Sequence, residues 1–191
     1  MGSWYPWKTD DAALATEWSV RSLLDRKVNV NARDRDGMTP LHFPAARAEI
    51  PILRLLIHHG ADFDAVNKNG HRPVHYAALV ERTVNLRYLL EAGARSDAGI
   101  DGNGGTALHI AARHGLIESA RILLEAKADA NAASAVGETA LHFAIHYRQH
   151  DVIDLLLLHS PNVDIYDSKG FGPLHIAVAY GLISVVRRLL G

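Results

Sequence analysis

One short motif recurs along this chain at an almost constant interval. The stretches TPLH at 39–42, RPVH at 72–75, TALH at 106–109, TALH at 139–142 and GPLH at 172–175 each end in a histidine. Successive histidines are separated by 33, 34, 33 and 33 residues. A fixed period of this length is typical of repeat architectures, in which each unit buries its apolar face against its neighbours.

Two further motifs keep the same phase. A glycine comes shortly before each histidine motif: Gly37, Gly70, Gly104, Gly137 and Gly170. A leucine-rich stretch follows at LLIHHGADFDA (55–65), LLEAGARSDA (89–98), LLEAKADANA (123–132) and LLLHSPNVDI (156–165). Three motifs in step over most of the chain exclude chance and indicate one repeated structural unit.

Each unit predicts two short helices. Thr39 can cap a helix start, and Pro40 after it is tolerated at the first helical position, where its missing N–H is not needed. Leu108 and Ala111 follow at helical spacing, and a second apolar helix is expected from about Ile117 to Glu125.

Turn residues separate these helices. Gly60 and Gly93 come where a left-handed residue ends a helix at low cost. The DxxG stretches at 34–37 and 167–170 predict β-turns between units.

These motifs resemble the ankyrin repeat, whose consensus includes G-x-T-P-L-H-x-A-A and L-L-L-x-x-G-A-D-V-N-A, and the resemblance covers nearly the whole chain. It implies an all-α solenoid of about six helix-turn-helix repeats with β-turn or hairpin fingers. Residues 1–191 would form a single domain. The expected repeats are a divergent first one at 4–36, then 37–69, 70–103, 104–136 and 137–169, and an incomplete last one at 170–191.

The two ends of the chain carry expectations of their own. The last repeat stops inside its second helix with apolar residues such as Val185 and Leu189, so we expect the natural chain to continue past Gly191; a frayed natural C-terminus is the alternative. The WYPW segment at 4–7 is expected to cover the core of the first repeat, or else to bind a partner.

Composition excludes several classes of function. The net charge of −1 provides no basic field for nucleic acid, and apolar runs such as LLLL at 155–158 are far too short for membrane insertion. The absence of cysteine excludes disulfides and fits a reducing compartment, so a cytoplasmic or nuclear location is expected. The first residues lack a basic segment followed by an apolar one, which argues against a signal peptide.

His142 and His146 lie four residues apart, a spacing that can hold zinc on one face of a helix. The zinc-protease motif H-E-x-x-H also needs a glutamate where Phe143 stands. Phosphate-loop and nucleophile-elbow motifs are absent too. The glycine-rich stretch at 99–105 is expected to be a turn lengthened by one residue rather than an anion-binding loop. We therefore expect no metal, no cofactor and no catalytic residue.

The resemblance implies a structural role for the periodic histidines. Each would tie its own turn to the neighbouring repeat through side-chain hydrogen bonds; they are His42, His75, His109, His142 and His175. If these imidazoles are buried and neutral, stability should fall as the pH drops through about 6.5. The resemblance also implies that Asn31 and Asn131 support their turns, and that they are candidates for hydroxylation.

The resemblance further implies a surface that binds a partner protein or peptide. Its residues are the turn tips and the exposed ends of the first helices, which together form the concave face. The turn-tip candidates are Arg35, Asp36, Met38, Lys68, Asn69, His71, Glu138, Lys169 and Phe171, and the helix-end candidates are Arg47, Val80, Arg113, His114, His146, Tyr147 and Tyr180. Exposed Tyr and Arg are typical interface anchors. Partial packing against the fingers of neighbouring repeats is the alternative interpretation.

The predicted function is a non-catalytic protein-binding module, expected to be monomeric. One alternative is the substrate-recognition domain of a larger enzyme or ubiquitin-ligase-type adaptor. A small-molecule or nucleic-acid binder is a further alternative, and the nearly neutral charge argues against nucleic acid.

Four departures from the family pattern mark places of interest. Pro44 replaces a helix-interior alanine and should distort its helix, because it removes a backbone hydrogen bond. Asn85 replaces an apolar residue and would need hydrogen-bond partners if buried. Arg148 and Lys127 each replace a glycine that follows a helix.

Overall fold

The computed structural model describes residues 20–47, 49–100, 105–159 and 161–191. The WYPW segment at 4–7 lies outside the described residues, so its expected capping role stays a prediction.

Helices come in pairs along the described chain, after a helix over residues 20–25. The pairs are α2 (His42–Arg47) with α3 (Ile50–His58), α4 (Pro73–Ala78) with α5 (Val84–Glu91), α6 (Ala107–His114) with α7 (Ile117–Glu125), α8 (Ala140–His146) with α9 (His150–Leu158), and α10 (Pro173–Ala179) with α11 (Ile183–Leu190). No strand occurs among the described residues. The predicted all-α repeat array of about five to six units is confirmed, and the second helix expected from about Ile117 to Glu125 has those bounds.

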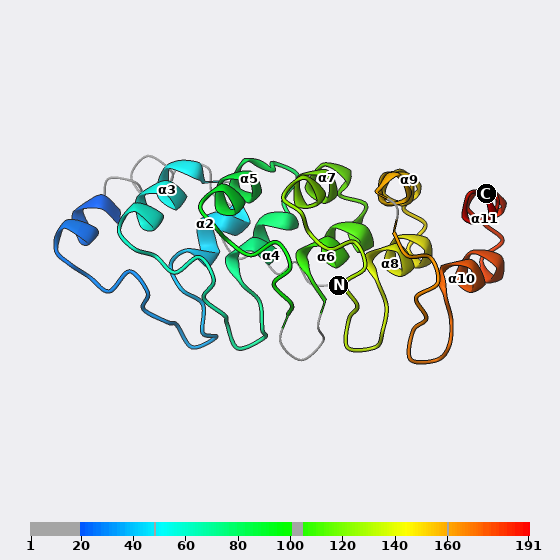
Figure 1. The fold of residues 1–191 in the computed structure, drawn as a ribbon. Helices are drawn as coiled ribbons and strands as arrows, with labels where there is room; N and C mark the ends of the chain where they lie inside the picture. Colours follow the sequence, from blue (N-terminus) through cyan, green and yellow to red (C-terminus); the bar gives the residue numbers. More distant parts are fainter. Residues whose placement is uncertain (1–19, 48, 101–104, 160) are drawn as a thin grey trace.

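The helices form two rows (Figure 1). The first helices of the pairs stack in the order α2, α4, α6, α8, α10, and the second helices stack as α3, α5, α7, α9. Long loops project along one edge of the first row, and we call them fingers (Figure 1). Backbone bonds join fingers directly, since the N–H of Lys68 donates to the carbonyl of Asp36 at 2.9 Å and that of Ser168 to Val136 at 2.8 Å. None of the described helices has the length and apolar character to cross a bilayer.

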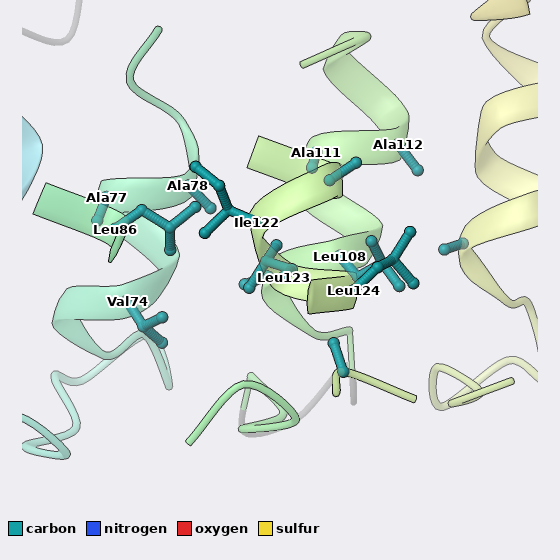
Figure 2. Close-up of a cluster of buried hydrophobic side chains, with 14 of the residues drawn as sticks. Val74, Ala77, Ala78, Leu86, Leu108, Ala111, Ala112, Ile122, Leu123 and Leu124 are labelled. Carbon is teal, nitrogen blue, oxygen red and sulfur yellow. The ribbon is translucent and has the colours of Figure 1, made fainter. Parts of the chain in front are cut away.

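The core lies between the two rows (Figure 2). Ala77 and Ala111 on the first helices are fully buried, and their small side chains let neighbouring helices approach closely. Leu86 and Leu123 on the second helices are also fully buried and fill the space between repeats. Each such leucine stabilises the fold by about 1.5–3 kcal/mol through burial.

The periodic histidines join each repeat to the next. The backbone N–H of Thr106 donates to Nδ1 of His109 at 3.0 Å, so this nitrogen is an acceptor and Nε2 carries the proton. Nε2 of His109 then donates to the carbonyl of Glu138 in the following finger at 3.0 Å. His42 and His142 repeat the arrangement, with Nε2 3.3 Å from the carbonyls of His71 and Phe171 respectively.

His75 and His175 differ from the other periodic histidines in their hydrogen bonds. Nε2 of His75 donates to the carbonyl of Ala98 at 2.7 Å, at the start of the finger that contains the extra residue. In that finger the backbone N–H of Ile100 donates to the carbonyl of Gly105, five residues later. In the preceding finger the N–H of Asn67 donates to the carbonyl of His71, only four residues later. His175 is exposed; its Nδ1 accepts from the N–H of Gly172 at 3.2 Å.

Side chains also hold the turns between repeats. Oδ1 of Asn31 accepts from the N–H of Asp62 at 2.8 Å, and its Nδ2 donates to the carbonyl of Gly60. Oδ1 of Asn131 accepts from the N–H of Asn162 at 2.7 Å. Both asparagines therefore bridge adjacent repeats, in line with the supporting role that the resemblance implies.

Candidate binding surface

The structure places the predicted binding residues on the fingers and at the ends of the first helices. Arg113 and His114 end α6, His146 ends α8, and Tyr147 and Tyr180 follow the last residues of α8 and α10. Most of the predicted set is exposed: Arg35, Asp36, Arg47, Lys68, Asn69, Arg113, His114, His146, Tyr147, Lys169, Phe171 and Tyr180.

The other four predicted residues are half-buried: Met38, His71, Val80 and Glu138. The sulfur of Met38 accepts a hydrogen bond from Nδ2 of Asn67 in the next finger at 3.1 Å. The carbonyls of His71 and Glu138 accept bonds from the structural histidines. Met38, His71 and Glu138 therefore take part in joining the repeats, and less of their surface is left for a partner.

Three residues of the predicted set form one connected group, which we call the aromatic ladder: His146, Tyr147 and Tyr180. The ring centre of His146 lies 5.1 Å from that of Tyr147 and 5.4 Å from that of Tyr180. The hydroxyl of Tyr180 also lies 3.2 Å from Nδ1 of His146. Tyr147 is 41% exposed and Tyr180 36%, so the ladder crosses from one repeat to the next at the surface.

Two arginines lie over the tyrosines of the ladder. The guanidinium carbon of Arg113 is 5.1 Å from the ring centre of Tyr147, and that of Arg148 is 5.5 Å from the ring centre of Tyr180. Such cation–π contacts contribute about 0.5–1 kcal/mol at exposed sites. Arg148 was not among the predicted site residues. The available signal was an arginine in place of glycine, directly after Tyr147.

A hollow of about 370 Å³ lies beside Arg113. Its walls include Ile110 of α6, Phe143 of α8 and Val136 of the following finger. Ile100 and Gly105 also line the hollow, and residues 101–104 between them lie outside the described part of the chain.

Not all of the imidazoles near this surface add positive charge at neutral pH. Partial burial, followed by the charge of Arg113, lowers the pKa of His114 below its ordinary value. Burial also lowers the pKa of His71. The cations that contact the ladder are Arg113 and Arg148.

His142 and His146, whose spacing could hold zinc, have different surroundings. His142 is fully buried with both ring nitrogens hydrogen-bonded, whereas His146 is exposed in the ladder. Within the described residues, no group of three or more His, Cys, Asp or Glu side chains is arranged to hold a metal ion.

The chain matches the family model for ankyrin repeats over residues 45–134 and 126–191. Among curated proteins it is similar to the ankyrin repeat and LEM domain-containing protein 1 homolog of Caenorhabditis elegans, with 48% identity over 44 residues, which are 23% of this chain and 6% of that protein. It is also 44% identical over 45 residues to palmitoyltransferase akr1 of Schizosaccharomyces pombe, covering 23% of this chain and 7% of that protein.

The stretch shared with the palmitoyltransferase is repeat sequence. The matched segments thus span less than a tenth of these relatives' lengths. The family model, in contrast, covers most of the chain with helix pairs of the expected kind. The chain belongs to the ankyrin repeat family, whose repeats are in general protein–protein interaction modules.

Proposed function

We propose that this chain binds a partner protein or peptide through its concave face and catalyses no reaction itself. The aromatic ladder is the observation that carries the proposal. Large, partly exposed rings that are already ordered by contacts with each other lose little conformational entropy when a partner covers them. His146, Tyr147 and Tyr180 meet this description, because each ring contacts another within the group.

The proposal is tested by affinity capture from native lysate, read by mass spectrometry. One bait carries His114→Ala, Tyr147→Ala and Tyr180→Ala. A matched control bait carries Val84→Ala, Leu158→Ala and Ile183→Ala, which remove three exposed apolar side chains from the second-helix row. Circular dichroism verifies that both variants are folded.

We expect the wild type and the control bait to capture a protein that the bait with His114→Ala, Tyr147→Ala and Tyr180→Ala does not capture. If all three baits capture the same proteins, the ladder does not bind the partner and the proposal is wrong.

The second candidate function is recognition on behalf of a larger enzyme or ubiquitin-ligase-type adaptor. The length of the relatives favours it, because the matched segments are only 6–7% of proteins that include palmitoyltransferases. The full-length reading frame tests this candidate: an enzymatic or adaptor domain joined to these repeats supports it, and its absence contradicts it.

A further inference from the structure

We infer that the Arg113–Tyr147 and Arg148–Tyr180 pairs bind the carboxylates of an acidic peptide segment. This inference rests on the proposed function and names the chemistry of the partner. The binding site that it assigns is made of these four residues, with His146 between the two tyrosines.

Arg113 and Arg148 both lack an acidic partner among the described residues. Four arginines in the described part of the chain form ion pairs: Arg47 with Glu49, Arg87 with Glu125, Arg121 with Glu118 and Arg188 with Asp154. Arg113 and Arg148 form no such ion pair with any described carboxylate, and contact tyrosine rings instead. Two neighbouring positive charges without counter-charges complement a negatively charged partner.

The guanidinium groups of these two arginines have N–H donors that a carboxylate can use. A guanidinium has five N–H donors in a fixed plane, which matches the two oxygens of a carboxylate. Arg148 uses one of them in a long bond of 3.4 Å to the carbonyl of Tyr180. Contact with a ring orders the guanidinium while its edge stays available, so less entropy is lost when a carboxylate binds.

The backbone of Arg148 is strained. Its φ of +58° lies in the left-handed region, where Gly115 and Gly181 stand at the equivalent positions of neighbouring repeats with φ of +70° and +66°. A side chain at such an angle costs about 1 kcal/mol or more, and strain of this kind is concentrated at functional sites. Lys27 and Lys127 also have positive φ, so the strain supports the site only together with the contact that the Arg148 side chain makes with Tyr180.

Asp167 and Glu138, two acidic residues on the adjoining fingers, form none of the ion pairs found among the described residues with Arg113 or Arg148. Oδ1 of Asp167 accepts the backbone N–H groups of Lys169 and Phe171, and is occupied within its own finger. Glu138 is half-buried and interacts electrostatically with His142. Lys169 is exposed on the same finger as Asp167 and adds positive charge.

The geometry also restricts the partner. Packed helices such as α8 and α10 are about 8–10 Å apart, so the two arginine–tyrosine pairs are separated by about that distance. An extended peptide covers it in about three residues. A partner with two acidic side chains about three positions apart can therefore reach both pairs. A basic partner is disfavoured, because the arginines already lie over the tyrosine rings.

The test is a selection of phage-displayed random twelve-residue peptides on the wild-type chain. We expect the selected peptides to be enriched in Asp and Glu and to bind less tightly as salt concentration rises. Their affinity should fall about tenfold or more for Arg113→Gln and for Arg148→Gly, the loss expected when a charge-assisted hydrogen bond is removed.

Matched controls separate this effect from changes in the fold. Lys127→Gly also replaces a residue of positive φ by glycine, at +66°, and should leave the affinity unchanged. Arg121→Gln removes an exposed arginine that is paired on α7, and should leave it unchanged as well.

The outcomes distinguish the two proposals. Peptides that bind without acidic enrichment, or bind the Arg113 and Arg148 variants as well as the wild type, contradict the carboxylate site; if they still lose affinity for Tyr147→Ala and Tyr180→Ala, the proposed function stands. Recovery of no specific peptide, or of peptides indifferent to the tyrosine variants as well, contradicts both proposals.

Discussion

Nδ2 of Asn85 in α5 donates a hydrogen bond of 2.7 Å to the carbonyl oxygen of Pro44 in α2. Asn85 is fully buried and also lies 3.4 Å from the carbonyl of Ala45. Both Pro44 and Asn85 depart from the family pattern, and they meet across adjacent repeats.

This hydrogen bond explains how Asn85 compensates for the effect of Pro44 on its helix. α2 begins at His42, whereas α4 and α6 begin two positions earlier in their repeats, at Pro73 and Ala107. This late start agrees with the distortion predicted for Pro44. A helix of six residues leaves most of its carbonyls without partners inside the helix. The amide of Asn85 supplies one of the missing donors from the neighbouring repeat.

Asn85→Ala is expected to lower the free energy of unfolding by about 0.5–1.5 kcal/mol, because the carbonyl of Pro44 loses its short bond and keeps only the 3.4 Å bond from the N–H of Glu49. Urea unfolding followed by circular dichroism measures the change. Ser119 on α7 is the matched control, since it occupies the equivalent position one repeat later and its buried hydroxyl has no hydrogen-bond partner. Ser119→Ala should therefore be neutral or stabilising, and equal losses for both variants would contradict this account.

Lys127→Gly is expected to raise the free energy of unfolding by about 0.5–1 kcal/mol, because glycine adopts positive φ without the cost that a Cβ imposes. Lys127 is exposed and has a φ of +66°, close to that of Gly60 at +82°. Glu125→Gly, within the last turn of α7, serves as the opposite control and should lower stability. A melting midpoint that falls for Lys127→Gly would show that its lysine is needed for another reason.

The 33-residue period predicted the fold well because every repeat meets the same physical requirements. A histidine three residues after the N-cap, alanines at the contact between first helices and leucines on the second helices recur in each unit, and they identified the helix pairs. Lys127 and Arg148 were recognised as substitutions of glycine for the same reason, since the position in the period is known.

The binding surface could be predicted only in part. The period located Tyr147 and Tyr180 at the ends of first helices, where the structure has them. Whether a side chain such as Met38 is exposed depends on the neighbouring finger, and there Asn67 covers it. The position of Arg148 over Tyr180 depends on the direction that a long side chain takes from a left-handed turn, which no periodic pattern specifies.

His109→Ala is expected to lower the free energy of unfolding by about 2–4 kcal/mol. The variant removes the acceptor for the N–H of Thr106 and the donor to the carbonyl of Glu138, and it leaves a cavity. His175→Ala is the matched control, because His175 is exposed, so its loss should cost less than about 1 kcal/mol. Equal losses in thermal or urea unfolding would mean that the bond to the following finger contributes nothing.

The free energy of unfolding is expected to fall as the pH drops from about 6.5 toward 4. Burial lowers the pKa of His75 from 6.5 to about 4, and burial also lowers the pKa of His42, His109 and His142. The folded state thus binds fewer protons at these sites than the unfolded state, so stability is lost as the pH falls below the ordinary histidine pKa. For His75 the loss is up to about 1.4 kcal/mol per pH unit between pH 6.5 and about 4.

Urea unfolding at pH 7.5, 6.5, 5.5 and 4.5 measures this dependence. His75→Gln removes one group of lowered pKa and should therefore reduce the slope. The lowered pKa of Asp167, caused mainly by the backbone N–H of Phe171, acts only around and below 3.8 and leaves this window unaffected. A free energy of unfolding that stays constant from pH 7.5 to 4.5 would show that the buried imidazoles titrate alike in both states.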